Sequence, residues 1–197
     1  MKPVLALLVL LCASISLRPQ DVKTETPPQL YTVPEAYEVY STLLPAEWTW
    51  RDAHSKTLVI QAETKPYQMC LVPDAKSKPL LDTAITDYMI VNGKTWNLDR
   101  RFDIAKTYQL VPRQTLFAAF NAAGPTGWAN FNAEHPDSVG WIELSAVGFN
   151  ADKTVAVVYA GHHCGGLCGG GGFWVFQRID AKWKPLKWSG SSCAWAS

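Results

Sequence analysis

The pattern that most constrains the fold is a succession of strand-like runs in the C-terminal part of the chain. Beyond Gly140, four segments are rich in β-branched and aromatic residues: 142–149, 154–160, 173–179 and 183–188. They are separated by residues 150–153, by a glycine-rich stretch and by residues 180–182. Consecutive strands joined by short turns pair as an antiparallel meander. The sequence therefore predicts a mainly antiparallel β-sheet here.

Helical patterns precede these strands. Residues 32–35 (Thr-Val-Pro-Glu) fit a capping box, and the helix that follows is expected to end before Pro45. A second helix is expected from Pro79, with Ser77 as its cap, to the Asn-Gly pair at residues 92–93. Each has apolar residues three or four positions apart. They are Ala36, Val39, Tyr40 and Leu43 in the first helix, and Leu81, Ala84, Ile85 and Tyr88 in the second.

Shorter elements complete the expected fold. Residues 57–63 and 67–72 are predicted as two strands around a turn at residues 65–66, with Cys70 inside the sheet. A strand at 108–111, a third helix at 112–121 and one or two helical turns at 128–136 follow. Helices early and strands late favour a single α+β domain over residues 34–197, with helices packed on one face of the sheet.

The N-terminus has the pattern of a secretory signal peptide over residues 1–16. A positively charged start is followed by eight apolar residues at positions 4–11 and small residues at 14–16. A membrane span needs about 20 apolar residues, so this run is too short. Cleavage would leave a flexible, proline-containing leader over residues 17–33. Lipidation at Cys12 is the alternative, although Leu11 stands where such sites have a small residue.

The charge balance excludes two classes of partner. The chain has 18 Lys and Arg against 17 Asp and Glu, and removal of Lys2 with the signal peptide leaves 17 of each. A neutral chain lacks the basic surface that nucleic acid or an anionic membrane requires. No other run approaches membrane length. We therefore expect a soluble periplasmic or secreted domain with no nucleic-acid partner and no membrane span.

Four cysteines remain after removal of Cys12: Cys70, Cys164, Cys168 and Cys193. An even number in an exported chain implies two disulfides, with three ways of pairing. Only three residues, two of them glycine, separate Cys164 from Cys168. This favours a local Cys164 to Cys168 bridge and a long-range Cys70 to Cys193 bridge, with the other pairings left open.

The most distinctive stretch is residues 161–172, in which seven of twelve residues are glycine. We interpret it as a loop whose shape depends on a disulfide, because glycines supply little packing area. A metal site made of His162, His163, Cys164 and Cys168 is an alternative. Structural zinc usually draws its ligand pairs from two separated segments, which disfavours it. A nucleophilic Cys activated by one of these histidines, or by His54 or His135, is another.

The expected function is binding rather than catalysis. The aromatic side chains of Phe173 and Trp174 fall on opposite faces of a strand. One of them is expected to be exposed as a platform for sugars or peptides. The alternative is that helices cover this second face. A non-catalytic domain would then bind a small molecule, glycan or protein partner through residues 161–172 and these aromatics, without a cofactor. The alternative is an exported hydrolase, or a thiol- or metal-dependent enzyme, using His162 or His163 with Cys164, Glu143 or Glu134.

Three motifs stand near the C-terminus. They are Ser-x-Val-Gly-Phe-Asn at residues 145–150, Cys-Gly-x-Leu-Cys-Gly at residues 164–169, and a tryptophan-containing ending around Trp183 and Trp195. In these motifs the chain resembles a group of exported bacterial proteins of unknown function. The resemblance implies membership but brings no activity, cofactor or catalytic residue. The order of helices and strands also loosely resembles the cone-shaped NTF2-type fold, which implies nothing about function.

Overall fold

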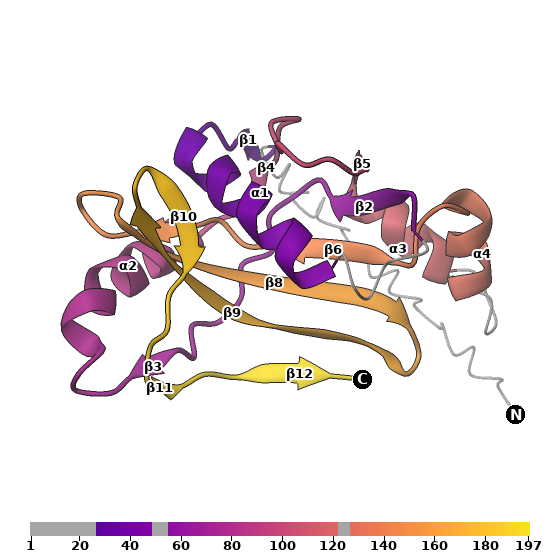
Figure 1. Cartoon of the computed structure of the whole chain (residues 1–197). Coiled ribbons are helices and arrows are strands. Elements are labelled where there is room, and N and C mark those ends of the chain that lie inside the picture. Colours follow the sequence, from indigo (N-terminus) through magenta and orange to yellow (C-terminus); the bar gives the residue numbers. More distant parts are fainter. Residues whose placement is uncertain (1–26, 49–54, 122–126) are drawn as a thin grey trace, which may run out of the picture.

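The computed structural model describes residues 27–48, 55–121 and 127–197 (Figure 1). The expected signal peptide and most of the expected leader lie outside these ranges. The helices within them are α1 (Pro34–Trp48), α2 (Lys78–Val91), α3 (Arg113–Asn121) and α4 (Gly127–Glu134). The last three of these helices confirm the predicted helical segments. The fold is α+β.

One large sheet dominates the described residues. Its order is β10-β9-β8-β6-β2-β5, with β7 also paired to β8 and β12 also paired to β9. The strands are β2 (Thr57–Gln61), β5 (Thr107–Val111), β6 (Trp141–Leu144), β7 (Gly148–Phe149), β8 (Val155–Gly165), β9 (Cys168–Ile179), β10 (Lys182–Pro185) and β12 (Ala194–Ala196). Two small pairs flank it: β1 (Gln29–Leu30) with β4 (Trp96–Asn97), and β3 (Val72–Pro73) with β11 (Gly190–Ser191). The antiparallel run from β6 through β8 and β9 to β10 confirms the predicted meander.

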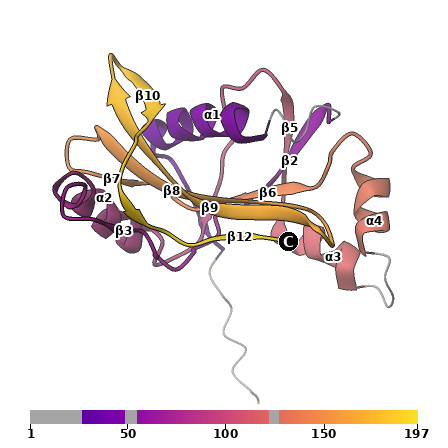
Figure 2. The same cartoon turned by 60° about the horizontal axis from the view of Figure 1, so that its bottom comes forward.

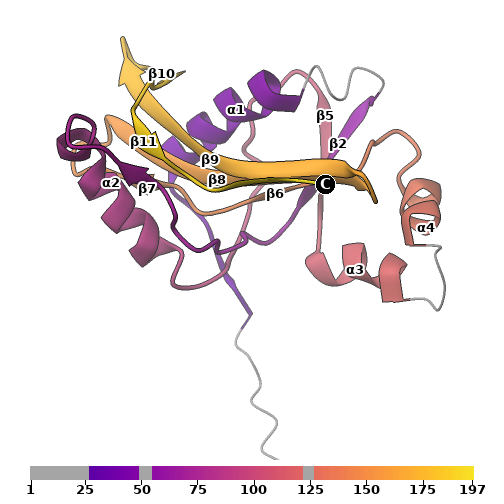
Figure 3. The ribbon, with the colours of Figure 1, turned by 90° about the horizontal axis from the view of Figure 1, so that it is seen from below.

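Helices cover both faces of this sheet, whereas the sequence predicted one (Figure 3). α1 packs with Ala156 and Val158 of β8, while α2 packs with Val155 and Val157 on the opposite face. β8 is apolar on both faces over its first half, which requires cover on each side. Gly148 lets α2 lie directly on β7, because a Cβ there would collide with the α2 backbone.

α1 continues through Pro45, although the sequence predicted an end before this residue. Proline removes one hydrogen bond from a helix interior and disturbs the preceding turn. Leu43 and Leu44, which are fully buried against the sheet, keep this turn in place. Burial of these two side chains therefore outweighs the local cost of the proline.

Of the two strands predicted at residues 57–63 and 67–72, the first is confirmed as β2, whereas the second and its pairing with the first are wrong. β2 instead lies between β5 and β6 and runs parallel to both. The backbone beyond Gln61 finds other partners: Ala62 N donates to Val111 O, and Lys65 N donates to Leu144 O, each at 2.8 Å. Residues 67–71 therefore form no strand, and Cys70 lies outside the large sheet.

The expected strand over residues 142–149 is divided into β6 and β7. Between them Ser145 N donates to Tyr159 O, and Ser145 Oγ accepts from Tyr159 N, each at 2.9 Å. The side chain of Ser145 thus replaces one backbone partner of β8. The last predicted strand also ends early, at Pro185 rather than Trp188.

The glycine-rich stretch is not a loop. Residues 161–165 extend β8, residues 168–172 open β9, and the turn lies at residues 166–167. The register pairs His163 with Gly169 and Gly161 with Gly171. Glycines in this hairpin are therefore parts of a ladder rather than of a free loop, and β12 lies along β9 beside them (Figure 2).

The packed part of the chain begins before residue 34, inside the segment that the sequence assigns to a flexible leader. β1 pairs with β4, and Tyr31 is 2% exposed among core residues. Its hydroxyl donates to Val147 O at 3.3 Å. Among the described residues, no helix is both long and apolar enough to cross a membrane.

Candidate functional site

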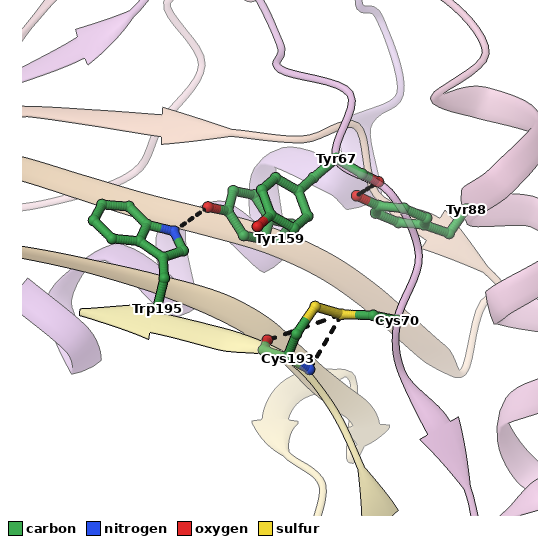
Figure 4. Close-up of a disulfide and its surroundings, with 6 residues drawn as sticks. All are labelled: Tyr67, Cys70, Tyr88, Tyr159, Cys193 and Trp195. Atoms are coloured by element: carbon green, nitrogen blue, oxygen red, sulfur yellow. Dashed lines mark hydrogen bonds between the residues drawn. A yellow bond between two sulfur atoms is a disulfide. The ribbon is translucent and has the colours of Figure 1, made fainter. Parts of the chain in front are cut away.

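Both disulfides join the cysteines that the sequence favoured. Cys164 and Cys168 close the tip of the β8 and β9 hairpin, with Cα atoms 5.1 Å apart. Cys70 and Cys193, with Cα atoms 5.8 Å apart, join the segment before β3 to the segment before β12 (Figure 4). A thiol nucleophile at Cys164 would require reduction of the first bridge.

The four residues proposed to bind a ligand do not meet at one place. Successive strand residues point to opposite faces, so His162 and Trp174 lie on the α1 side, whereas His163 and Phe173 lie on the α2 side. His162 is 3% exposed, with Nε2 3.0 Å from Val139 O. Phe173 packs against Tyr67, Tyr88 and Tyr159 and is no open platform.

On the α2 side, a buried carboxylate gathers partners from two other segments. Glu143 of β6 is 3% exposed. Its oxygens each accept a hydrogen bond from Lys65 Nζ at 2.9 Å, and Oε2 lies 3.2 Å from His163 Nε2. Tyr159 Oη lies 3.4 Å from Oε1. Burial alone would raise the pKa of Glu143, but His163 and Lys65 together hold it below the usual value.

Aromatic rings cover this carboxylate. Tyr67 stacks on Tyr159 with ring centroids 4.0 Å apart, and Trp195 Nε1 donates to Tyr159 Oη at 2.6 Å (Figure 4). Burial, together with the nearby Glu143 charge, raises the pKa of Tyr159 above its ordinary value. Tyr88 donates to Tyr67 O at 3.2 Å, and burial raises its pKa to about 12. The phenols of Tyr88 and Tyr159 therefore stay protonated donors at neutral pH.

The glycines of the hairpin make room for these side chains. A Cβ on Gly161 would stand 2.9 Å from Glu143 Oε1, and one on Gly171 would stand 2.5 Å from Trp195 Nε1. Real Cβ atoms do not come this close to such neighbours. The absence of side chains therefore has a structural use on this face, where the hairpin packs against Glu143 of β6 and Trp195 of β12.

On the other face the same hairpin borders a cavity of about 360 Å³. The register places Gly170 and Gly172 opposite Ala196 and Ala194 of β12, so small residues form its floor. Trp174, which is half-buried against the α1 side of the core, stands beside them. Its full lining is residues 169–172, Phe173, Trp174, Ser192, Ala194, Trp195 and Ala196. None of these side chains is ionisable.

The other acidic and histidine candidates lie elsewhere. Glu134 is exposed at the end of α4, and the ring of His135 contacts Phe131. His54 lies outside the described residues. Within the described ranges, no three His, Cys, Asp or Glu side chains gather as metal ligands would.

Lys65 and Tyr159 are site residues that the sequence analysis missed. Lys65 was assigned to a turn, and Tyr159 was placed within the predicted strand at residues 154–160. Glu143, a carboxylate inside a strand of apolar residues, is the signal that could have indicated a buried cluster, since such a charge requires partners.

Comparison with protein families, with curated proteins and with solved structures gives no match.

Proposed function

We propose that this chain is an exported, non-catalytic binding domain whose ligand site is the 360 Å³ cavity bordered by the paired strands β9 and β12. The observation that carries the proposal is the lining of this cavity: an indole wall at Trp174 beside a floor of glycine and alanine. Its volume falls within the range of small-molecule sites. The glycine-rich hairpin thus contributes as a rigid floor rather than as an adaptable loop.

The lining favours a neutral glycan as the ligand. No charged side chain lies there to attract or to neutralise an ionic group. The flat face of an indole suits the apolar face of a sugar ring, while hydroxyl groups can bond to backbone and to Ser192 at the rim. A small neutral molecule or an extended peptide would use the same two features, and both serve as comparison ligands.

Export is supported by the N-terminal pattern and by the two disulfides, which persist in oxidising compartments. Membership of the exported bacterial group is supported only by the three C-terminal sequence motifs. We also propose that the curved sheet and its helices resemble the NTF2-type fold.

A second candidate is an acid-base hydrolase, favoured by the 3.2 Å separation of His163 Nε2 and Glu143 Oε2. This pair has the residue types of a catalytic dyad. Against it, Lys65 occupies both carboxylate oxygens and Trp195 lies over the pair, with its ring centroid 5.1 Å from that of His163. Binding at the β9 and β12 cavity remains the better-supported function.

The test is a titration of the mature protein with neutral trisaccharides, followed through amide signals in NMR spectra. The panel contains maltotriose, cellotriose and triacetylchitotriose, with trialanine as the peptide comparison. We expect saturable shifts confined to residues 169–174 and 192–196, and about a tenfold weaker affinity for Trp174→Ala. Trp188→Ala, outside the cavity lining, is the control and keeps the wild-type affinity.

Trisaccharide binding that survives Trp174→Ala would contradict this site. Saturable binding of trialanine alone would contradict the glycan assignment. Hydrolysis of any trisaccharide that is lost in Glu143→Gln would favour the hydrolase instead.

A further inference from the structure

A second and larger cavity, of about 740 Å³, lies at the carboxyl end of the parallel strand β2. It opens where β2 ends at Gln61 and extends over the next residues, Glu63 and Lys65. Lys94 and Arg113 approach it from two further segments, after α2 and at the start of α3. It shares no lining residue with the cavity bordered by β9 and β12.

The topology makes this end of the sheet a favourable place for a ligand. β5 and β6 lie on opposite sides of β2, and all three strands run parallel. The connections that leave β2 and β5 therefore diverge beyond the carboxyl ends of these strands. In sheets with parallel strands, a crevice at such a divergence is the usual ligand position.

The charges of the lining favour an anion. Lys65, Lys94 and Arg113 stand against the single carboxylate of Glu63. Glu63 Oε2 is engaged, because it accepts from the backbone N of Arg113 at 2.7 Å. Within the described ranges, Lys94 Nζ contacts neutral groups: Gln29 Oε1 at 2.8 Å and the ring of Trp96 at 3.9 Å from its centroid. Lys94 and the guanidinium of Arg113 are thus left without an acidic partner in the described structure.

Gln61 adds a hydrogen-bond acceptor to the lining. This residue is 2% exposed yet borders the cavity. Its Nε2 donates to Glu63 O at 2.8 Å, while no described residue donates to its Oε1. Because this residue lines the cavity, a hydroxyl or N–H group of a bound molecule could donate to the free amide oxygen.

We propose that this cavity is a binding site for a small hydroxylated anion. The anionic group, carboxylate or phosphate, lies between Lys94 and Arg113, and a hydroxyl of the same molecule donates to Gln61 Oε1. Lys65 contributes positive potential at the wall while it stays paired with Glu143. The site is separate from the one in the proposed function and does not depend on it.

Citrate is the first probe, titrated into the full mature chain at low ionic strength and followed through amide signals. Tricarballylate, which is citrate without its hydroxyl, tests the contact with Gln61. Glucose 6-phosphate tests a phosphate in place of carboxylates, and glycerol tests a hydroxyl without charge. We expect saturable citrate shifts at residues 61–65, 94–95 and 113, and weaker binding of tricarballylate by about threefold to tenfold.

Two variants and one control isolate the charges. Lys94→Gln with Arg113→Gln is expected to weaken citrate binding at least about tenfold, because two charge-assisted contacts are lost. Lys182→Gln with Lys184→Gln removes equal charge from exposed positions of β10 and is expected to change the affinity less than about twofold. Gln61→Leu is expected to equalise citrate and tricarballylate. Lys65 is left intact, because its removal would leave Glu143 buried with one partner fewer.

Stronger binding of glucose 6-phosphate than of citrate supports the site and identifies phosphate as the preferred anionic group. Stronger binding of citrate supports the site and identifies carboxylate as the preferred group. Three results overturn it: no saturable binding of either anion up to about 10 mM, equal loss in the β10 control, or shifts spread outside the cavity. Melting temperatures of the variants, measured alongside, separate loss of binding from loss of folding.

Discussion

The indole Nε1 of Trp195 donates to Oη of Tyr159 at 2.6 Å, directly over Gly171. A Cβ on residue 171 would stand 2.5 Å from that nitrogen and 2.7 Å from that oxygen. The bond therefore requires glycine at this position. Through it, the segment after Cys193 is fixed to the centre of the sheet next to the Glu143 cluster.

Gly171→Ala is expected to lower the free energy of unfolding by about 1–3 kcal/mol, because the added methyl group displaces Trp195 or Tyr159. Gly166→Ala is the matched control. A Cβ there has no atom within 4 Å, so a change of no more than about 0.5 kcal/mol is expected. Denaturant unfolding measures both, and equal losses would show that the crowding at residue 171 is unimportant.

Lys65→Met is expected to destabilise the fold by about 1–3 kcal/mol, since it removes one partner of a buried carboxylate while Lys65 itself is partly exposed. Lys56→Met breaks an exposed pair with Asp137, 3.5 Å long, and should cost no more than about 1 kcal/mol. Chemical denaturation of both variants gives the comparison. A larger loss for Lys56→Met would contradict the role assigned to Lys65.

Glu143→Gln tests the pH dependence of the cluster. The pKa of Glu143 is lower in the folded chain than its ordinary value of 4.5, so its ionised form stabilises the fold above that value. This contribution is lost as the pH falls through the lower, folded value. The difference in unfolding free energy between wild type and Glu143→Gln should therefore shrink from about pH 6 to about pH 3. A difference independent of pH would argue against an ionised Glu143.

The two disulfides should differ in their effect on stability. In the chain-entropy model the ring closed by Cys164 and Cys168 contributes about 2 kcal/mol, and the long loop closed by Cys70 and Cys193 about 5 kcal/mol. The double variant Cys164→Ser with Cys168→Ser should loosen the hairpin tip, which faster amide exchange would show. Its free energy of unfolding should change little. If this pair proved the more destabilising of the two double variants, the hairpin tip would be part of the stabilising core.

The export proposal predicts a mature chain that begins near Leu17. N-terminal sequencing of protein secreted by its native host measures this directly. An intact start at Met1 in the exported fraction would contradict it.

Local patterns predicted local structure well. The apolar spacing of α2 and its end at Asn92 lie within a few neighbouring residues and appear in the structure as predicted. Ser77 stands at the N-cap position, but its side chain makes no cap hydrogen bond and contacts Ser189 instead. The pairing of Cys164 with Cys168 was favoured for the same reason, because three residues separate them.

Long-range relationships could not be predicted. The parallel position of β2 between β5 and β6 depends on segments about 50 and 80 residues away. The contact of Lys65 with Glu143 joins residues 78 positions apart. The glycine-rich stretch was predicted to be a loop because glycines supply little packing area. Only the fold shows that Trp195 and Tyr159 need the space that Gly171 leaves.

The most direct test of the proposed function is the trisaccharide affinity of Gly172→Ala. A Cβ at residue 172 would stand 3.4 Å from the nearest atom, an ordinary contact, so the fold should keep its stability. The same methyl group would enter the cavity bordered by β9 and β12, beside Trp174. We predict that Gly172→Ala weakens binding of the preferred trisaccharide by about tenfold while Gly166→Ala leaves it unchanged. Equal affinities of wild type and Gly172→Ala would contradict a ligand seated on the glycine floor.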